Sequence, residues 1–118
     1  MNNSSFLFSV LLSVYHRESI KNIENSLNSI LKNQTVQPTE IVLIKDGILS
    51  DEVEHFLGEL ERKESRIKIY GYEINMGLGY ALDFGLKKCS HELVFRMDTD
   101  DISIPERFSI QLDLMEKN

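Results

Sequence analysis

Four short apolar segments alternate with segments of helical periodicity, and this alternation constrains the fold of the 118-residue chain more than any other feature. The apolar segments are Leu7 to Val14, Glu40 to Lys45, Arg66 to Tyr72, and Glu92 to Met97. Strands that alternate with helices are typical of a parallel sheet with crossover helices. The first segment is almost continuously apolar, as expected of a strand covered on both faces. The sequence therefore predicts an α/β fold with a Rossmann-like, mostly parallel sheet.

The segments between the strands are predicted to be helices. The apolar residues of the first two helices recur at helical spacing. They are Ile20, Ile23, Leu27, Ile30 and Leu31 in the first helix, and Val53, Phe56, Leu57 and Leu60 in the second. The third is expected over Gly77 to Lys88 with Leu78, Ala81, Leu82 and Leu86 inward, and the last carries Phe108, Leu112 and Met115. Capping boxes are predicted at Asp51 with Glu54 and at Ser103 with Glu106.

Charge and cysteine content narrow the class of protein. The net charge is −6 with acids and bases mixed along the chain, which argues against a nucleic-acid-binding face. The single Cys89 excludes an internal disulfide and fits a reducing compartment. The apolar segment at Leu7 to Val14 is too short to span a bilayer. We therefore expect one cytoplasmic domain over residues 1–118, possessing no transmembrane segment.

Three carboxylates lie within the four residues Asp98-Thr99-Asp100-Asp101, directly after the last apolar segment. Acids this close repel each other unless a positive group sits among them. Mg²⁺ and Mn²⁺ prefer carboxylate oxygens and complete their shells with phosphates. The alternative is a solvated acidic turn that caps the next helix. The tetrapeptide alone favours neither interpretation.

Polar side chains follow every predicted strand. They are, strand by strand, Tyr15, His16, Arg17 and Glu18, then Asp46 and Gly47, then Glu73, Asn75, Met76 and Gly77, then Asp98, Asp100 and Asp101. In an open parallel sheet, ligands bind at the carboxyl ends of the strands. The sequence therefore predicts one ligand site at this edge of the sheet.

Several of these residues have a structural alternative. Tyr15 either stacks on a planar base or packs internally. Asp46-Gly47 is a common turn pair; in a binding role the carboxylate would accept from a nucleobase imide while the glycine permits close approach. Asn75 opens a loop that leads to a helix N-terminus suited to phosphate, although the pattern is weak.

Two arginines need partners. Arg96 lies inside an otherwise apolar strand, where the nearby acids or a bound diphosphate would supply the opposite charge. Arg107 is expected to pair with Asp101 or Asp100 in a structural role.

Five stretches in order resemble glycosyltransferase family 2, in particular bacterial enzymes that build lipopolysaccharide, capsule or exopolysaccharide. The stretches are Phe8 to Tyr15, Gln34 to Leu43, Asp46-Gly47, Asn75 to Leu82 and Arg96 to Phe108. The resemblance implies a GT-A fold and inverting, hexosyltransferase-type transfer from a nucleotide-sugar donor, often UDP-linked, to a saccharide or lipid-linked acceptor. Asp98 and Asp100 match the family's D-x-D motif, which implies that Asp100 binds Mn²⁺ or Mg²⁺ with Asp98 near the ribose and sugar. The nucleotide-binding residues it implies are Tyr15, Glu18, Asp46, Gly47, Asn75, Arg96 and Asp98, with Asp46 at the uracil edge.

Family catalytic domains continue into an acceptor-binding half that carries the catalytic base, and no acid here matches that later motif. The chain is thus expected to be the nucleotide-sugar-binding half, with the base beyond Asn118 and no transfer by the isolated chain. The alternative is a non-catalytic nucleotide-binding or assembly module. An uncovered apolar face would favour a homo-oligomer, and membrane association is expected only through the missing part.

Other Mg²⁺-dependent α/β proteins fit less well. Phosphoacceptor domains carry an acid pair after the first strand, where this chain has Tyr15 to Glu18. Nucleotidyltransferases carry a glycine-rich basic loop at that place, and this chain has none.

Overall fold

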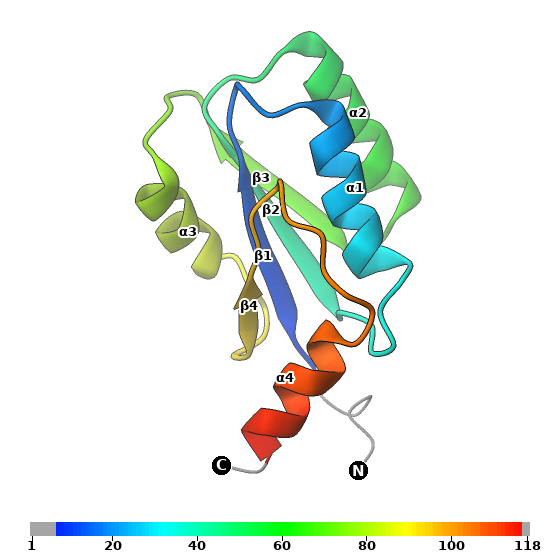
Figure 1. Cartoon of the computed structure of the whole chain (residues 1–118). Helices are drawn as coiled ribbons and strands as arrows, with labels where there is room; N and C mark the ends of the chain where they lie inside the picture. Colours follow the sequence, from blue (N-terminus) through cyan, green and yellow to red (C-terminus); the bar gives the residue numbers. More distant parts are fainter. Residues whose placement is uncertain (1–6, 117–118) are drawn as a thin grey trace.

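The computed structural model describes residues 7–116, which form a single parallel sheet with helices on both faces (Figure 1). The elements are β1 (Ser9–Val14), α1 (Ile20–Leu31), β2 (Glu40–Asp46), α2 (Asp51–Lys63), β3 (Ile67–Tyr72), α3 (Leu78–Leu86), β4 (Val94–Arg96) and α4 (Arg107–Glu116). The strand order is β3-β2-β1-β4, and all three neighbouring pairs are parallel. This architecture confirms the predicted α/β fold.

β1 is apolar on both faces because it lies inside the sheet. Its residues alternate between the two faces, as in any strand. Val10 and Leu12 belong to the main core, on the face that α1 and α2 cover, whereas Leu11 packs with Ala81 of α3 on the other face (Figure 1). The near-continuous apolar character of β1 therefore results from burial on both faces of the sheet, as the sequence predicted.

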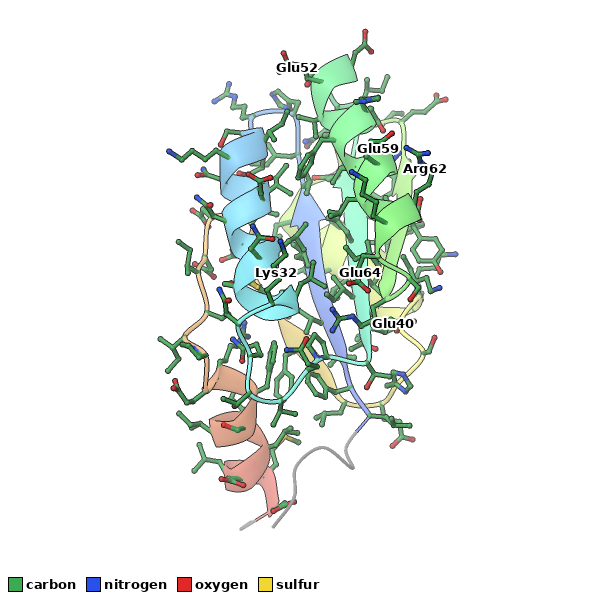
Figure 2. All side chains as sticks on the ribbon, turned by 90° about the vertical axis from the view of Figure 1, so that its right-hand side faces the viewer. Lys32, Glu40, Glu52, Glu59, Arg62 and Glu64 are labelled. Atoms are coloured by element: carbon green, nitrogen blue, oxygen red, sulfur yellow. The ribbon has the colours of Figure 1, made fainter. Side chains whose placement is uncertain are left out.

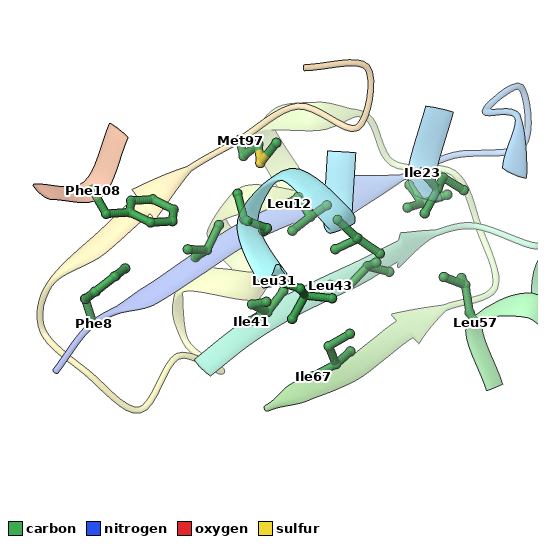
Figure 3. Packing of buried hydrophobic residues seen from close by; sticks show 14 of the residues in the cluster. Phe8, Leu12, Ile23, Leu31, Ile41, Leu43, Leu57, Ile67, Met97 and Phe108 are labelled. Carbon is green, nitrogen blue, oxygen red and sulfur yellow. The ribbon is translucent and has the colours of Figure 1, made fainter. Parts of the chain in front are cut away.

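The main core extends along the sheet from α2 to α4 (Figure 3). At the α4 end, Phe8 lies with its ring centroid 5.0 Å from that of Phe108 and 5.4 Å from that of Phe95. These three rings attach α4 to the strands. Phe108 and Leu112 are the buried residues of α4, whereas Met115 is exposed.

α3 lies close against the sheet through a small residue. A Cβ added at Gly85 would collide with the side chains of Leu11 and Ile44. Leu86, predicted inward, is exposed, since it is turned about 100° around the helix axis from Gly85. Leu78, also predicted inward, is half exposed at the first residue of α3.

Both predicted capping boxes are wrong. The N-cap of α2 is Ser50, whose hydroxyl accepts a hydrogen bond from the Val53 amide at 3.3 Å. α4 begins only at Arg107, and the Ser103 hydroxyl accepts from the guanidinium of that residue at 3.0 Å. In each case the spacing of a capping box is present in the sequence, but the hydrogen bonds form between other residues.

The outer side of the α1–α2 layer carries charged side chains, including the ion pair of Glu59 with Arg62 (Figure 2). Such exposed pairs contribute little to stability. Within residues 7–116, no helix has both the length and the apolar character needed to cross a bilayer.

Candidate functional site

A cleft of about 360 Å³ lies at the carboxyl edge of the sheet. From β1 the chain builds the sheet outward through β2 and β3, and it then places β4 on the other side of β1. Ligands of open α/β sheets bind beside such a reversal of strand order. The residues that line the cleft are Ser13, Tyr15, Glu18, Asp46, Asn75, Gly77, Leu78, Asp98, Thr99 and Asp100.

The structure brings six of the predicted site residues together in this cleft, and they come from all four strand ends. They are Tyr15, Glu18, Asp46, Asn75, Asp98 and Asp100. Their binding roles remain predictions. Ser13, Thr99 and Leu78 also line the cleft, although the sequence offered no signal for them beyond their position near a strand end.

Of the residues that the resemblance implies, Gly47 and Arg96 do not line the cleft. Among the other residues named after the strands, Gly77 lines it, but His16, Arg17, Glu73, Met76 and Asp101 do not. Gly47 has φ +93°, and a Cβ there would lie 2.8 Å from the Asn75 backbone nitrogen. The close approach that requires this glycine is thus made by the chain's own loop after β3. Arg96 is exposed because β4 is an edge strand, so its charge needs no buried partner.

The Asp46 carboxylate is buried and holds three parts of the chain together. Its Oδ1 accepts hydrogen bonds from the Tyr72 hydroxyl at 2.9 Å and the Met76 amide at 2.8 Å. Its Oδ2 accepts from the Gly77 amide at 3.1 Å. Burial, followed by the hydrogen bond to Asp46, raises the pKa of Tyr72. A carboxylate accepts about four hydrogen bonds, so roughly one position remains for a nucleobase.

The sequence did not predict Tyr72 as a partner of Asp46, since it identified Tyr72 only as the last residue of a strand. The two residues pair in register across β2 and β3. That neighbourhood depends on the alignment of two strands, which residue types alone did not specify.

Asp98, Asp100 and Asp101 are all exposed, and one carboxylate oxygen from each lies within 4.8 Å of the others. The Asp101 amide donates to the Asp98 carbonyl at 3.1 Å, so the segment is a turn. The Asp101 carboxylate also accepts from the Asp98 amide at 3.3 Å. The acids do not cap the next helix, which begins at Arg107. The sequence offered a solvated turn and a metal site as interpretations. The turn is present, and its three carboxylates lie close together, as a metal site would also require.

Four carboxylates line the cleft, and no lysine, arginine or histidine is among the described residues that line it. A ligand bearing phosphates would be repelled by this surface unless a cation lay between them. Clustered carboxylate oxygens are the donors that hard divalent cations prefer. The side chains of Asp98 and Asp100 therefore fit a divalent cation.

Arg107 does not form the predicted ion pair with Asp101 or Asp100 within the described residues. Its guanidinium donates instead to the Arg96 carbonyl at 2.7 Å and to Ser103 and Gln111. Burial lowers the pKa of Arg107, and the nearby Asp101 charge opposes that shift. The predicted structural role is present, with a backbone carbonyl as the partner.

Curated bacterial proteins are similar to the whole chain. The UDP-Gal:alpha-D-GlcNAc-diphosphoundecaprenol beta-1,3-galactosyltransferase of Escherichia coli is 42% identical over 118 residues, which are 100% of this chain and 42% of that protein. The amylovoran biosynthesis glycosyltransferase AmsE of Erwinia amylovora is 43% identical over 112 residues, or 95% of this chain and 41% of that protein. The chain spans about two fifths of the length of these relatives.

A solved structure shares both fold and sequence similarity. Residues 1–349 of S. aureus TarS in complex with UDP superpose with a TM-score of 0.78 at 28% identity, covering 95% of this chain and 32% of that chain. The family model for glycosyl transferase family 2 matches residues 9–118. With its parallel α/β sheet and its match over almost the whole length, the chain belongs to glycosyl transferase family 2.

Proposed function

We propose that the chain is the nucleotide-sugar-binding part of an inverting, metal-dependent, hexosyltransferase-type glycosyltransferase. The donor is a UDP-linked sugar and the acceptor a saccharide or lipid-linked saccharide, in the synthesis of a bacterial surface polysaccharide. The E. coli and E. amylovora relatives support the reaction class, and the UDP complex of TarS supports the nucleotide. The proposed location is the cytoplasm, including the inner face of the membrane.

The observation that carries this proposal is that Asp98 and Asp100 lie close together in a cleft at the carboxyl edge of the sheet, and that the other charged residues of this cleft are also acids. A nucleoside diphosphate brings further negative charge to that cleft. Binding there requires a cation that both the carboxylates and the phosphates can ligate. The cleft volume of about 360 Å³ is within the range of small-molecule sites.

Each residue has a proposed role. Asp100 and Asp98 hold Mn²⁺ or Mg²⁺, and Tyr15 and Glu18 line the nucleoside pocket. Asp46 positions the loop that carries Asn75 and offers its remaining acceptor position to the uracil. When bound, the cation neutralises charge on the departing nucleoside diphosphate.

The catalytic base lies outside the chain. Inversion requires a carboxylate that removes the proton of the acceptor hydroxyl on the face opposite the leaving group. The acids of the cleft are assigned to the donor side, so the isolated chain binds donor without transferring sugar.

The exposed apolar residues Ile110 and Met115 of α4 support association with a second copy, which sedimentation would detect.

The test is calorimetric titration of UDP into the chain with Mn²⁺ and again with EDTA, followed by the same titrations on Asp100→Ala. We expect binding that requires the metal and is lost in Asp100→Ala. Asp83→Ala is the matched control, because Asp83 is an exposed acid on α3 that pairs with Lys87 and does not line the cleft. Binding that is indifferent to both metal and Asp100 would refute the proposed role of the acidic segment.

The alternative is a nucleotide-binding module that takes no part in transfer, and it shares the same site. A transfer assay with UDP-sugars on the full-length protein separates the two. Product formation that is lost in Asp100→Ala supports the transferase, whereas retained UDP binding without product supports the module.

A further inference from the structure

The acidic segment has exposed side chains, but its backbone is held against α1. In Figure 1 the segment between β4 and α4 (orange) runs beside α1 before it reaches α4. Three buried polar residues face it: Ser26 and Ser29 on α1 and Gln34 just after it, which we call the α1 clamp.

The two serines hold the part of the segment that carries the acids. The Ser26 hydroxyl lies 2.5 Å from the carbonyl oxygens of both Thr99 and Asp101, to which it donates. The Ser29 hydroxyl accepts from the Ser103 amide at 3.0 Å and donates to the Ser26 carbonyl. These bonds fix the backbone on both sides of Asp100.

Gln34 holds the part that leads into α4. Its amide nitrogen donates to the Ile104 carbonyl at 2.6 Å and to the Ser29 carbonyl at 3.0 Å. Its oxygen accepts from the Phe108 amide at 3.2 Å. Every hydrogen bond from the clamp to the segment ends on a backbone atom, so the clamp leaves the acidic side chains free for a ligand.

Apolar burial does little to hold the segment between Asp100 and Arg107. Its two large apolar side chains, Ile102 and Ile104, are 69% and 59% exposed. Meanwhile the three carboxylates repel each other across distances of at most 4.8 Å. The hydrogen bonds within the Asp98–Asp101 turn and those of the clamp both oppose this repulsion.

We propose that Ser26, Ser29 and Gln34 are positioning residues that keep Asp98 and Asp100 within reach of one divalent cation before it arrives. This inference rests on the proposed function, because it assumes that the acids bind a metal. Preorganised ligands bind a metal more tightly, since the cost of gathering them is met during folding.

The test measures Mn²⁺ affinity in the presence of UDP, from the electron paramagnetic resonance signal of free Mn²⁺. The variants are Ser26→Ala and Gln34→Met, of which the second keeps the side-chain volume but removes all three hydrogen bonds. We expect the Mn²⁺ dissociation constant to rise roughly tenfold in each. Unchanged affinity in both folded variants would overturn the proposal.

Ser9→Ala is the matched control for lost stability. Ser9 is equally buried and its hydroxyl donates to Glu40 at 2.7 Å, at the amino-terminal edge of the sheet. Ser9→Ala removes a buried, hydrogen-bonded hydroxyl, as Ser26→Ala does, but at the edge of the sheet opposite the acidic segment. We therefore expect unchanged Mn²⁺ affinity. An equal loss of affinity in Ser9→Ala would show that the clamp acts through general stability only, and would also overturn the proposal.

Amide hydrogen exchange without metal separates this inference from the proposed function. We expect faster exchange at Asp101 and Ser103 in Ser26→Ala and in Gln34→Met, and unchanged exchange there in Ser9→Ala. If the native chain binds no Mn²⁺, the proposed function fails, and exchange alone decides whether the clamp exists. Unaltered exchange in both clamp variants would refute it.

Discussion

Asp46 and the pair Asp98 and Asp100 are acids of the same cleft, yet their surroundings are opposite. Asp46 is buried and accepts three hydrogen bonds from Tyr72, Met76 and Gly77. Asp98 and Asp100 are exposed, and within residues 7–116 no donor reaches either carboxylate. A partnered carboxylate stabilises the chain that surrounds it, whereas an unpartnered one keeps its lone pairs for a ligand. The cleft therefore separates the acid that shapes it from the acids that we propose to bind the cation.

This difference leads first to a prediction for Asp46→Ala, where we expect the largest loss of stability. The Tyr72 hydroxyl and two backbone amides would lose their acceptor, which should lower the free energy of unfolding by about 3 kcal/mol. Urea denaturation measures this change. Asp46→Asn, which keeps one acceptor oxygen, should lose less. A loss near zero for Asp46→Ala would show that the Asp46 carboxylate does not stabilise the fold.

Tyr72→Phe tests one of the three bonds alone. Removing the hydroxyl that donates to Asp46 at 2.9 Å should cost about 1 kcal/mol of unfolding free energy. Tyr80→Phe is the control, since Tyr80 is half exposed and should change stability by less than about 0.5 kcal/mol. Equal effects in the two variants would mean that the contact with Asp46 adds nothing.

Glu40 extends the comparison to a partnered acid at the opposite edge of the sheet. Burial acts to raise its pKa, but hydrogen bonds from Ser90 and Ser9 outweigh it and lower the pKa below the usual 4.5. The group thus adds stability above its unfolded pKa, and this is lost as pH falls through the folded pKa. We expect stability to decline less steeply below pH 4.5 in Glu40→Gln than in the native chain. Circular dichroism of urea unfolding against pH measures it, and parallel curves would contradict the prediction.

Asp100→Asn should have the smallest effect on stability. Its carboxylate has no partner to lose, and neutralising it relieves repulsion from Asp98 and Asp101. We expect a change within about 0.5 kcal/mol, on the stabilising side, in urea denaturation with EDTA present. Asp98→Asn should behave alike. A loss above about 1 kcal/mol in either variant would assign that acid a structural role like that of Asp46.

The sheet class and the edge at which the cleft lies could both be predicted from the order of residues along the chain. Both depend on local order along the chain: apolar periodicity sets each element, and polar residues directly after a strand must emerge at its carboxyl end. Six predicted residues therefore meet in one cleft even though they come from the ends of four separate strands.

The hydrogen-bond partners of those residues could not be predicted, because they depend on how distant parts of the chain pack together. Asp46 bonds to Tyr72 and to Gly77, 26 and 31 residues later, and Gln34 bonds to Ile104, 70 residues later. Arg96 is exposed rather than paired because the strand order places β4 at the edge. These contacts depend on which strands are neighbours and how they align, and a residue's type and local spacing carry no record of either.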